Sequence, residues 1–109
     1  MLSASICGIK LRNPTVLASG ILGISKELAK RIGSIGAGAV TLKSLCHEPR
    51  KGNPNPTMAV FEGGMIYAVG LPGQGIDNAM NDFKSLNDLG VPVIGSIFGY
   101  TIEDFGRVA

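Results

Sequence analysis

Histidine and charged residues are scarce in this 109-residue chain, and each scarcity excludes a class of function. The single histidine, His47, gives no secure basis for a Ser-His-Asp triad. The tripeptide Cys46-His47-Glu48 lacks a second Cys/His pair that could complete four zinc ligands, so we expect no metal site. The net charge of +2 is small and the basic residues do not cluster, which argues against a nucleic-acid partner.

Cysteine and long apolar runs are scarce as well. The only two cysteines are Cys7 and Cys46, and no basic start followed by a long apolar stretch occurs in the first eleven residues. No apolar run approaches the roughly 18 residues that cross a membrane. We therefore expect a reducing, cytoplasmic location and no membrane contact.

The chain is rich in apolar residues. Hydrophobic residues make up 45% and charged residues 17%, a balance that suits elements buried on both faces or a piece of a larger barrel. The length is enough for one domain with a core of its own. We expect residues 1–109 to form a single unit.

Short apolar segments bounded by glycine, proline or polar residues predict strands. A small β-hairpin is expected over residues 5–11, and the Asn13-Pro14 dipeptide marks a turn after it. Possible arms of a second hairpin lie within a long irregular loop, at 57–61 and 65–68. Three short apolar strands are predicted, at residues 15–18 (TVLA), 39–42 (AVTL, buried) and 93–97 (VIGSI).

The segments between these three strands have apolar residues at helical spacing, which predicts helices. The first helix is expected to begin at a Ser25 cap and the third at the capping box of Thr101 and Asp104. Gly90 is expected to end the second helix. The predicted apolar stripes are Leu28, Ile32 and Ile35 on the first helix, and Ile76, Met80, Phe83 and Leu86 on the second.

Alternating strands and helices indicate an α/β fold with a parallel sheet. Such brief strands favour a (β/α)₈ barrel over a doubly wound sheet, but a barrel needs about 250 residues. The prediction is therefore the N-terminal part of a barrel, about three βα units, in one incomplete domain. The strand at 93–97 would then form an exposed apolar edge.

Barrel function lies at the C-terminal ends of the strands. These ends read Ala18-Ser19-Gly20, Lys43-Ser44 and Ser96. Lys43 can place a cation against a reduced flavin or a carboxylate, or it can be an ordinary lysine that extends to solvent. The glycine-rich loop at 63–75 can cover a ligand, or it can be a plain surface turn.

Three segments carry a resemblance to a known family: NPTVLASGILG (13–23), GAGAVTLKSLCHEPRKGNPNPTM (36–58) and EGGMIYAVGLPGQG (62–75). They resemble the N-terminal part of dihydroorotate dehydrogenase, and they are most similar to the class 1 type that pairs with an FAD/iron–sulfur subunit. The resemblance covers nearly the whole chain. It implies an FMN-binding (β/α)₈ barrel that oxidises dihydroorotate to orotate in pyrimidine biosynthesis, as a homodimer.

The resemblance also implies roles for individual residues. Lys43 would contact both flavin and substrate, as the catalytic charge stabiliser. The other implied flavin-binding residues are Ala18, Ser19, Gly20, Ser44 and Ser96. The implied substrate-binding residues are Tyr67, Val69, Gly70 and Leu71, the last three through their backbone.

Three positions depart from the family's pattern Asn-Ala-Met-Gly-Leu-Pro-Asn. Tyr67 and Gly73 stand where that pattern has asparagine, and Val69 stands where it has methionine. A tyrosine offers one hydroxyl in place of an amide's paired donor and acceptor. A related FMN barrel acting on another pyrimidine-like ring therefore stays open as an alternative.

The family's catalytic base, a cysteine or serine on a later loop, has no counterpart in this sequence. Cys46 does not match its position. We therefore expect the 109 residues alone to have no appreciable turnover. The alternative from another class is a non-catalytic partial barrel that self-associates or pairs with a separate chain.

Overall fold

Three parallel strands form the sheet in the computed structural model, which describes residues 2–20, 22, 25–84 and 86–109. They are β3 (Val16–Leu17), β4 (Ala39–Thr41) and β7 (Val93–Ile94), in the order β3-β4-β7. Both pairings are parallel, with Leu17 opposite Val40 and Val40 opposite Val93. The predicted parallel arrangement is confirmed, with shorter strands than the apolar segments suggested.

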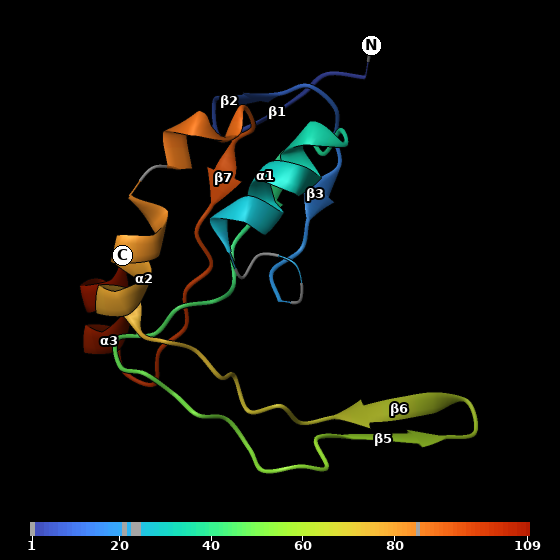
Figure 1. The fold of residues 1–109 in the computed structure, drawn as a ribbon, viewed down its shortest axis with the longest axis vertical. Coiled ribbons are helices and arrows are strands. Elements are labelled where there is room, and N and C mark those ends of the chain that lie inside the picture. The colour runs from blue at the N-terminus through green and yellow to red at the C-terminus, as the bar shows by residue number, and fades with distance from the viewer. Residues whose placement is uncertain (1, 21, 23–24, 85) are drawn as a thin grey trace.

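The helices lie on the connections between these strands (Figure 1). Helix α1 (Lys26–Ser34) links β3 to β4, and its first turn is capped as predicted, because the Leu28 N–H donates to Ser25 Oγ at 3.2 Å. Helix α2 (Ile76–Phe83) and the short 3₁₀ helix η1 (Leu86–Leu89) precede β7. Helix α3 (Ile102–Val108) follows β7 and begins with the predicted capping box of Thr101 and Asp104.

The core lies between the sheet and α1. Ala39 and Val40 on β4 are fully buried, because β4 has a strand on each side and α1 packs against it. Burial of this kind stabilises a fold by roughly 25 cal/mol per Å² of apolar surface removed from water. The buried cluster consists of Ala29, Val40, Leu42, Leu89 and Val91.

Two members of the predicted apolar stripes, Ile35 and Met80, are exposed. Ile35 is 74% exposed because α1 ends at Ser34 and Ile35 serves as its C-cap, beyond the face that packs on the sheet. Met80 is 55% exposed, and its neighbour Ala79 is the buried residue of α2. Helical periodicity thus sets which residues share a face but not how far a packed face extends.

Two predicted elements are interrupted. Helix α2 ends at Phe83, and Leu86 belongs to η1, while residue 85 lies outside the described residues. Strand β7 ends at Ile94, and pairing resumes only at a single bridge between Leu45 and Ile97. Among the described strands β7 pairs on one side only, as expected of the edge predicted at 93–97.

Two antiparallel hairpins complete the fold, and both were predicted. Strands β1 (Ala4–Ile6) and β2 (Ile9–Leu11) lie beside the N-terminal ends of the sheet strands, where an apolar cavity of about 210 Å³ separates them from Ala39, Pro92 and Ile94. Strands β5 (Met58–Phe61) and β6 (Gly64–Tyr67) project away from the body as an arm (Figure 1). No helix in the described part of the chain has the length and apolar character to span a membrane.

Candidate functional site

Three serine side chains join the C-terminal ends of the three parallel strands. Ser19 Oγ donates to the Leu42 carbonyl at 2.8 Å and lies 2.9 Å from Ser44 Oγ. Ser44 Oγ in turn lies 2.7 Å from Ser96 Oγ. The predicted residues Ser19, Ser44 and Ser96 thus form one continuous hydrogen-bonded row across the sheet edge.

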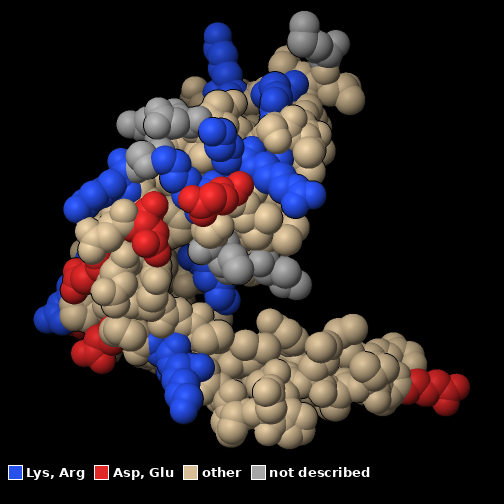
Figure 2. All heavy atoms as spheres, in the orientation of Figure 1, with Lys and Arg blue, Asp and Glu red and all other residues tan. Residues whose placement is uncertain are grey.

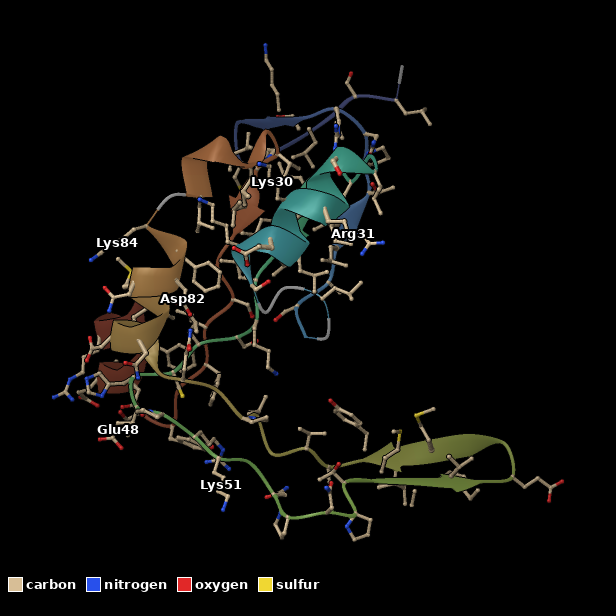
Figure 3. All side chains as sticks on the ribbon, viewed as in Figure 1. Lys30, Arg31, Glu48, Lys51, Asp82 and Lys84 are labelled. Atoms are coloured by element: carbon tan, nitrogen blue, oxygen red, sulfur yellow. The ribbon has the colours of Figure 1, made fainter. Side chains whose placement is uncertain are left out.

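Lys43 lies beside this row and places a positive charge next to it. The side chain is half-buried and lines a cleft together with Ser19 and Ser44. Within the described residues, its ammonium group makes no hydrogen bond or ion pair. Figure 3 shows Lys51, on the following loop, pointing away from the space between the body and the arm. Lys43 is therefore the basic side chain that the described residues present to the cleft.

The loop after β6 forms the opposite wall of this cleft, and residues 50–53 hold it in place. Asn53 donates from its backbone N–H to the Val69 carbonyl at 3.0 Å and from Nδ2 to the Ala68 carbonyl at 2.9 Å. Arg50 Nε donates to the Gly70 carbonyl at 2.6 Å. Three successive carbonyls of this loop are thus occupied by one neighbouring segment.

These bonds orient the backbone donors of the loop. In a trans peptide the carbonyl and the following N–H point in opposite directions. The N–H groups of Val69, Gly70 and Leu71 therefore point away from residues 50–53, and within the described chain none of them donates a hydrogen bond. Successive unpaired N–H groups of this kind can bind carbonyl or carboxylate oxygens.

The conformation of this loop requires glycine at position 70. Its φ is +79°, and a Cβ there would lie 2.7 Å from Asn53 Cγ and 2.8 Å from its backbone nitrogen. The next residue, Leu71, also has a positive φ, of 52°, which a leucine seldom adopts. Strained backbone conformations of this kind gather at ligand-binding segments.

The cleft between the two walls has a volume of about 540 Å³, and Figure 2 shows a wide hollow between the arm and the body. Most of the predicted site residues meet here. Ala18 and Ser96 do not line the cleft; Ala18 is exposed, and Ser96 lies behind Ser44 in the serine row. The lining consists of Ser19, Gly20, Lys43, Ser44, Tyr67, Ala68, Val69, Gly70, Leu71 and Pro72.

Sequence reasoning missed the residues that hold the site together. Arg50 and Asn53 do not line the cleft, yet they fix the loop at 68–70. Arg50 also lies over the Tyr100 ring, 5.6 Å from its centroid. Their polar side chains in a segment rich in glycine and proline were a signal for side-chain to backbone bonds. The sequence did not indicate which backbone they would reach.

A second pocket, of about 280 Å³, lies beside Cys46, His47 and Glu48. Among the described residues, no three side chains of the metal-binding types gather in one place. Asp104 lines this pocket, and the N–H of Tyr100, which donates to its carboxylate, is the main cause that lowers the pKa of Asp104. This arrangement caps α3.

Comparison with known proteins agrees with the geometry. The family model described as dihydroorotate dehydrogenase matches residues 1–109. Two similar relatives are named "Dihydroorotate dehydrogenase B (NAD(+)), catalytic subunit": that of Methanocaldococcus jannaschii is 44% identical over 100% of this chain and 37% of its own length, and that of Methanocella arvoryzae is 47% identical over 94% and 34%. The chain spans about a third of the length of these relatives.

Solved structures give the same result for the fold. The dihydroorotate dehydrogenase of Eimeria tenella in complex with ferulenol matches with a TM-score of 0.69 and 21% identity, over 88% of this chain and 27% of that one. Its ligand-free form matches with a TM-score of 0.69 and 22% identity, over 94% and 32%. At this identity the likeness shows the fold, which is the predicted N-terminal part of a (β/α)₈ barrel. With a family model that matches every residue, the chain belongs to the dihydroorotate dehydrogenase family.

Proposed function

We propose that these residues form the N-terminal part of an FMN-dependent enzyme that oxidises dihydroorotate to orotate in pyrimidine biosynthesis. The observation that carries the proposal is the cleft itself. The Lys43 ammonium and the N–H groups of Val69, Gly70 and Leu71, which have no partner among the described residues, line one space with Ser19 and Ser44. Family membership supplies the reaction class.

The residues present fit a flavin. The cleft volume of about 540 Å³ lies within the usual range for cofactor sites, roughly 300–1,000 Å³. Ser19 and Gly20 are small, so a flat ring can approach the backbone at the end of β3. When bound, FMN would accept the hydride that the substrate loses.

Lys43 would stabilise the negative charge that develops on the flavin and the substrate. An ammonium group held in a partly dehydrated cleft stabilises negative charge more strongly than it does in water. Its half-buried position between the serine row and the loop at 68–72 suits contact with both the flavin ring and the substrate. The N–H groups of Val69, Gly70 and Leu71 would bind acceptor oxygens of the pyrimidine and orient it. No proton abstraction is assigned to these residues.

The relatives' names support the proposal of a partner subunit. The name "catalytic subunit" describes those proteins as one part of an assembly. For this protein we propose a homodimer that transfers electrons to an FAD/iron–sulfur subunit in the cytoplasm, with no nucleic-acid or membrane partner.

The direct test uses the full-length protein. Purified without added flavin, it should retain FMN, and dihydroorotate should bleach the flavin absorbance under anaerobic conditions. The absence of FMN, or a flavin that dihydroorotate does not reduce, would contradict the proposal.

Tyr67 favours one second candidate, a related ring as substrate. Tyr67 lines the cleft and is 62% exposed, so its hydroxyl is free to meet a ligand where the family pattern has an amide. Flavin bleaching by another dihydropyrimidine, faster than bleaching by dihydroorotate, would favour this candidate. Tyr67→Asn in the full-length protein should then shift the preference toward dihydroorotate.

A further inference from the structure

The serine row has only one possible arrangement of its protons. Each hydroxyl carries one proton, and the row contains three contacts: Ser19 to the Leu42 carbonyl, Ser19 to Ser44, and Ser44 to Ser96. The carbonyl of Leu42 can only accept, so the Ser19 proton lies in the first contact. Ser44 must then donate to Ser19, and Ser96 must donate to Ser44.

This arrangement uses every hydroxyl proton within the row. Ser19 and Ser44 line the cleft, and each has one lone pair left and no proton left. We propose that the Ser19 and Ser44 hydroxyls form a hydrogen-bond acceptor edge of the cleft, which can receive an N–H or O–H group of a ligand but cannot donate to one.

The donors of the cleft come from its other residues. Among the described lining, they include the Lys43 ammonium, the Tyr67 hydroxyl and the backbone N–H groups of the loop at 69–71. The complementary ligand is a flat heterocycle that presents a ring N–H to Ser19 and Ser44 and a carbonyl or anionic edge to Lys43. A cyclic imide or ureide has these neighbouring groups, and the flavin and the dihydropyrimidine of the proposed function both contain one.

Ser96 has a positioning role in this scheme. It does not line the cleft, but by donating to Ser44 it occupies one of that residue's two lone pairs and aligns its hydroxyl toward Ser19. Chains of hydrogen bonds that share one direction also strengthen one another. The three hydroxyls therefore donate in one direction along the row, with the Leu42 carbonyl as the terminal acceptor.

Neutron diffraction from deuterium-exchanged crystals of the full-length protein tests the proposal directly. The expected map places one deuteron in each of the three contacts, with the Ser19 deuteron directed at the Leu42 carbonyl. A deuteron of Ser19 or Ser44 that points into the cleft would overturn the proposal.

A set of variants tests the same point with bound FMN as the probe. In Ser19→Ala, Ser44 loses its acceptor, and its freed proton should donate to a ring carbonyl and shift that carbonyl's infrared band to lower frequency. Ser19→Thr retains a hydroxyl and should keep the original band. Ser96→Ala should also keep it, because Ser44 still donates to Ser19. An unshifted band in Ser19→Ala, or an equal shift in Ser96→Ala, would contradict the proposal.

The ligand class rests on the proposed function, but the proton arrangement does not. If the full-length protein fails to retain FMN, the proposed function fails, while the neutron map of the same protein still reports on the serine row. If FMN binds and the map shows a proton directed into the cleft, only the acceptor edge is refuted.

Discussion

The sheet body and the β5–β6 arm are stabilised in different ways. In the body, Ala39 and Val40 are completely buried, and the packed cluster around them comes from α1, β4 and the segment at 89–91. In the arm, all eight strand residues are exposed, among them Val60 at 78% and Ile66 at 63%. Two-stranded hairpins are marginally stable by themselves in water. The body is therefore stabilised by its own buried core, whereas no described residue covers either face of the arm.

The cleft lies where these two regions meet. Its one wall consists of strand ends fixed by the core, with Leu42 buried directly before Lys43. Its other wall is the loop that leaves the arm, held through Arg50 and Asn53. The Lys43 ammonium therefore belongs to the wall that the core supports. The backbone N–H groups of residues 69–71 belong to the wall that a few hydrogen bonds from Arg50 and Asn53 hold in place.

The largest expected effect is on the stability of the sheet body. Leu42→Ala removes a side chain that is 4% exposed, and it should lower the free energy of unfolding by about 2–5 kcal/mol. Val60→Ala in the arm should change it by less than about 0.5 kcal/mol, because that side chain is exposed. Chemical denaturation of both variants measures the difference. Equal losses would mean that another part of the assembly covers the arm in solution.

The next largest effect is expected on flavin reduction, from Lys43 on the wall formed by the strand ends. Lys43→Ala in the full-length protein should slow flavin reduction by about 10²–10³-fold, the usual cost of removing one electrostatic stabiliser, while the fold is kept. Lys51→Ala is the matched control, since Lys51 points away from the cleft (Figure 3), and its rate should be unchanged. Stopped-flow absorbance gives both rates. Retention of the full rate in Lys43→Ala would refute the role assigned to it.

A smaller effect is expected on substrate binding by the loop wall that Arg50 and Asn53 hold in place. Gly70→Ala should weaken substrate binding by about 1–3 kcal/mol, since it combines an unfavourable φ with a contact against Asn53. Gly63→Ala is the control, because Gly63 has a similar φ of +83° but open space around its Cβ position. Titration of the oxidised protein with orotate compares the two. Equal affinities would mean that contact with Asn53 does not set the loop.

The smallest effect concerns the end of the body. Hydrogen bonds from Tyr100 and Thr101 lower the pKa of Asp104, so its contribution to α3 is present above its ordinary pKa of 3.8 and is lost as the pH falls through the lowered value. Asp104→Asn should make the α3 amides exchange faster at pH 7 and remove this acid dependence. Glu103→Gln, in the same helical turn, should leave it in place. Hydrogen exchange followed between pH 2 and pH 7 tests both.

Local sequence was sufficient for the elements and their order. The Ser25 and Thr101 caps, both hairpins and the three parallel strands were predictable because capping, turn formation and apolar alternation act over a few residues. Ile35 and Met80 were not, because their exposure depends on where a packed face ends.

The sequence by itself determined that Lys43 and three serines follow parallel strands, and therefore that they share one edge of the sheet. The tertiary structure alone decided two further points. The strand register placed Ser19, Ser44 and Ser96 within hydrogen-bonding distance, and the path of the long loop placed Asn53 against the carbonyls of Ala68 and Val69. Both depend on contacts between residues 15 to 52 positions apart, which local periodicity does not specify.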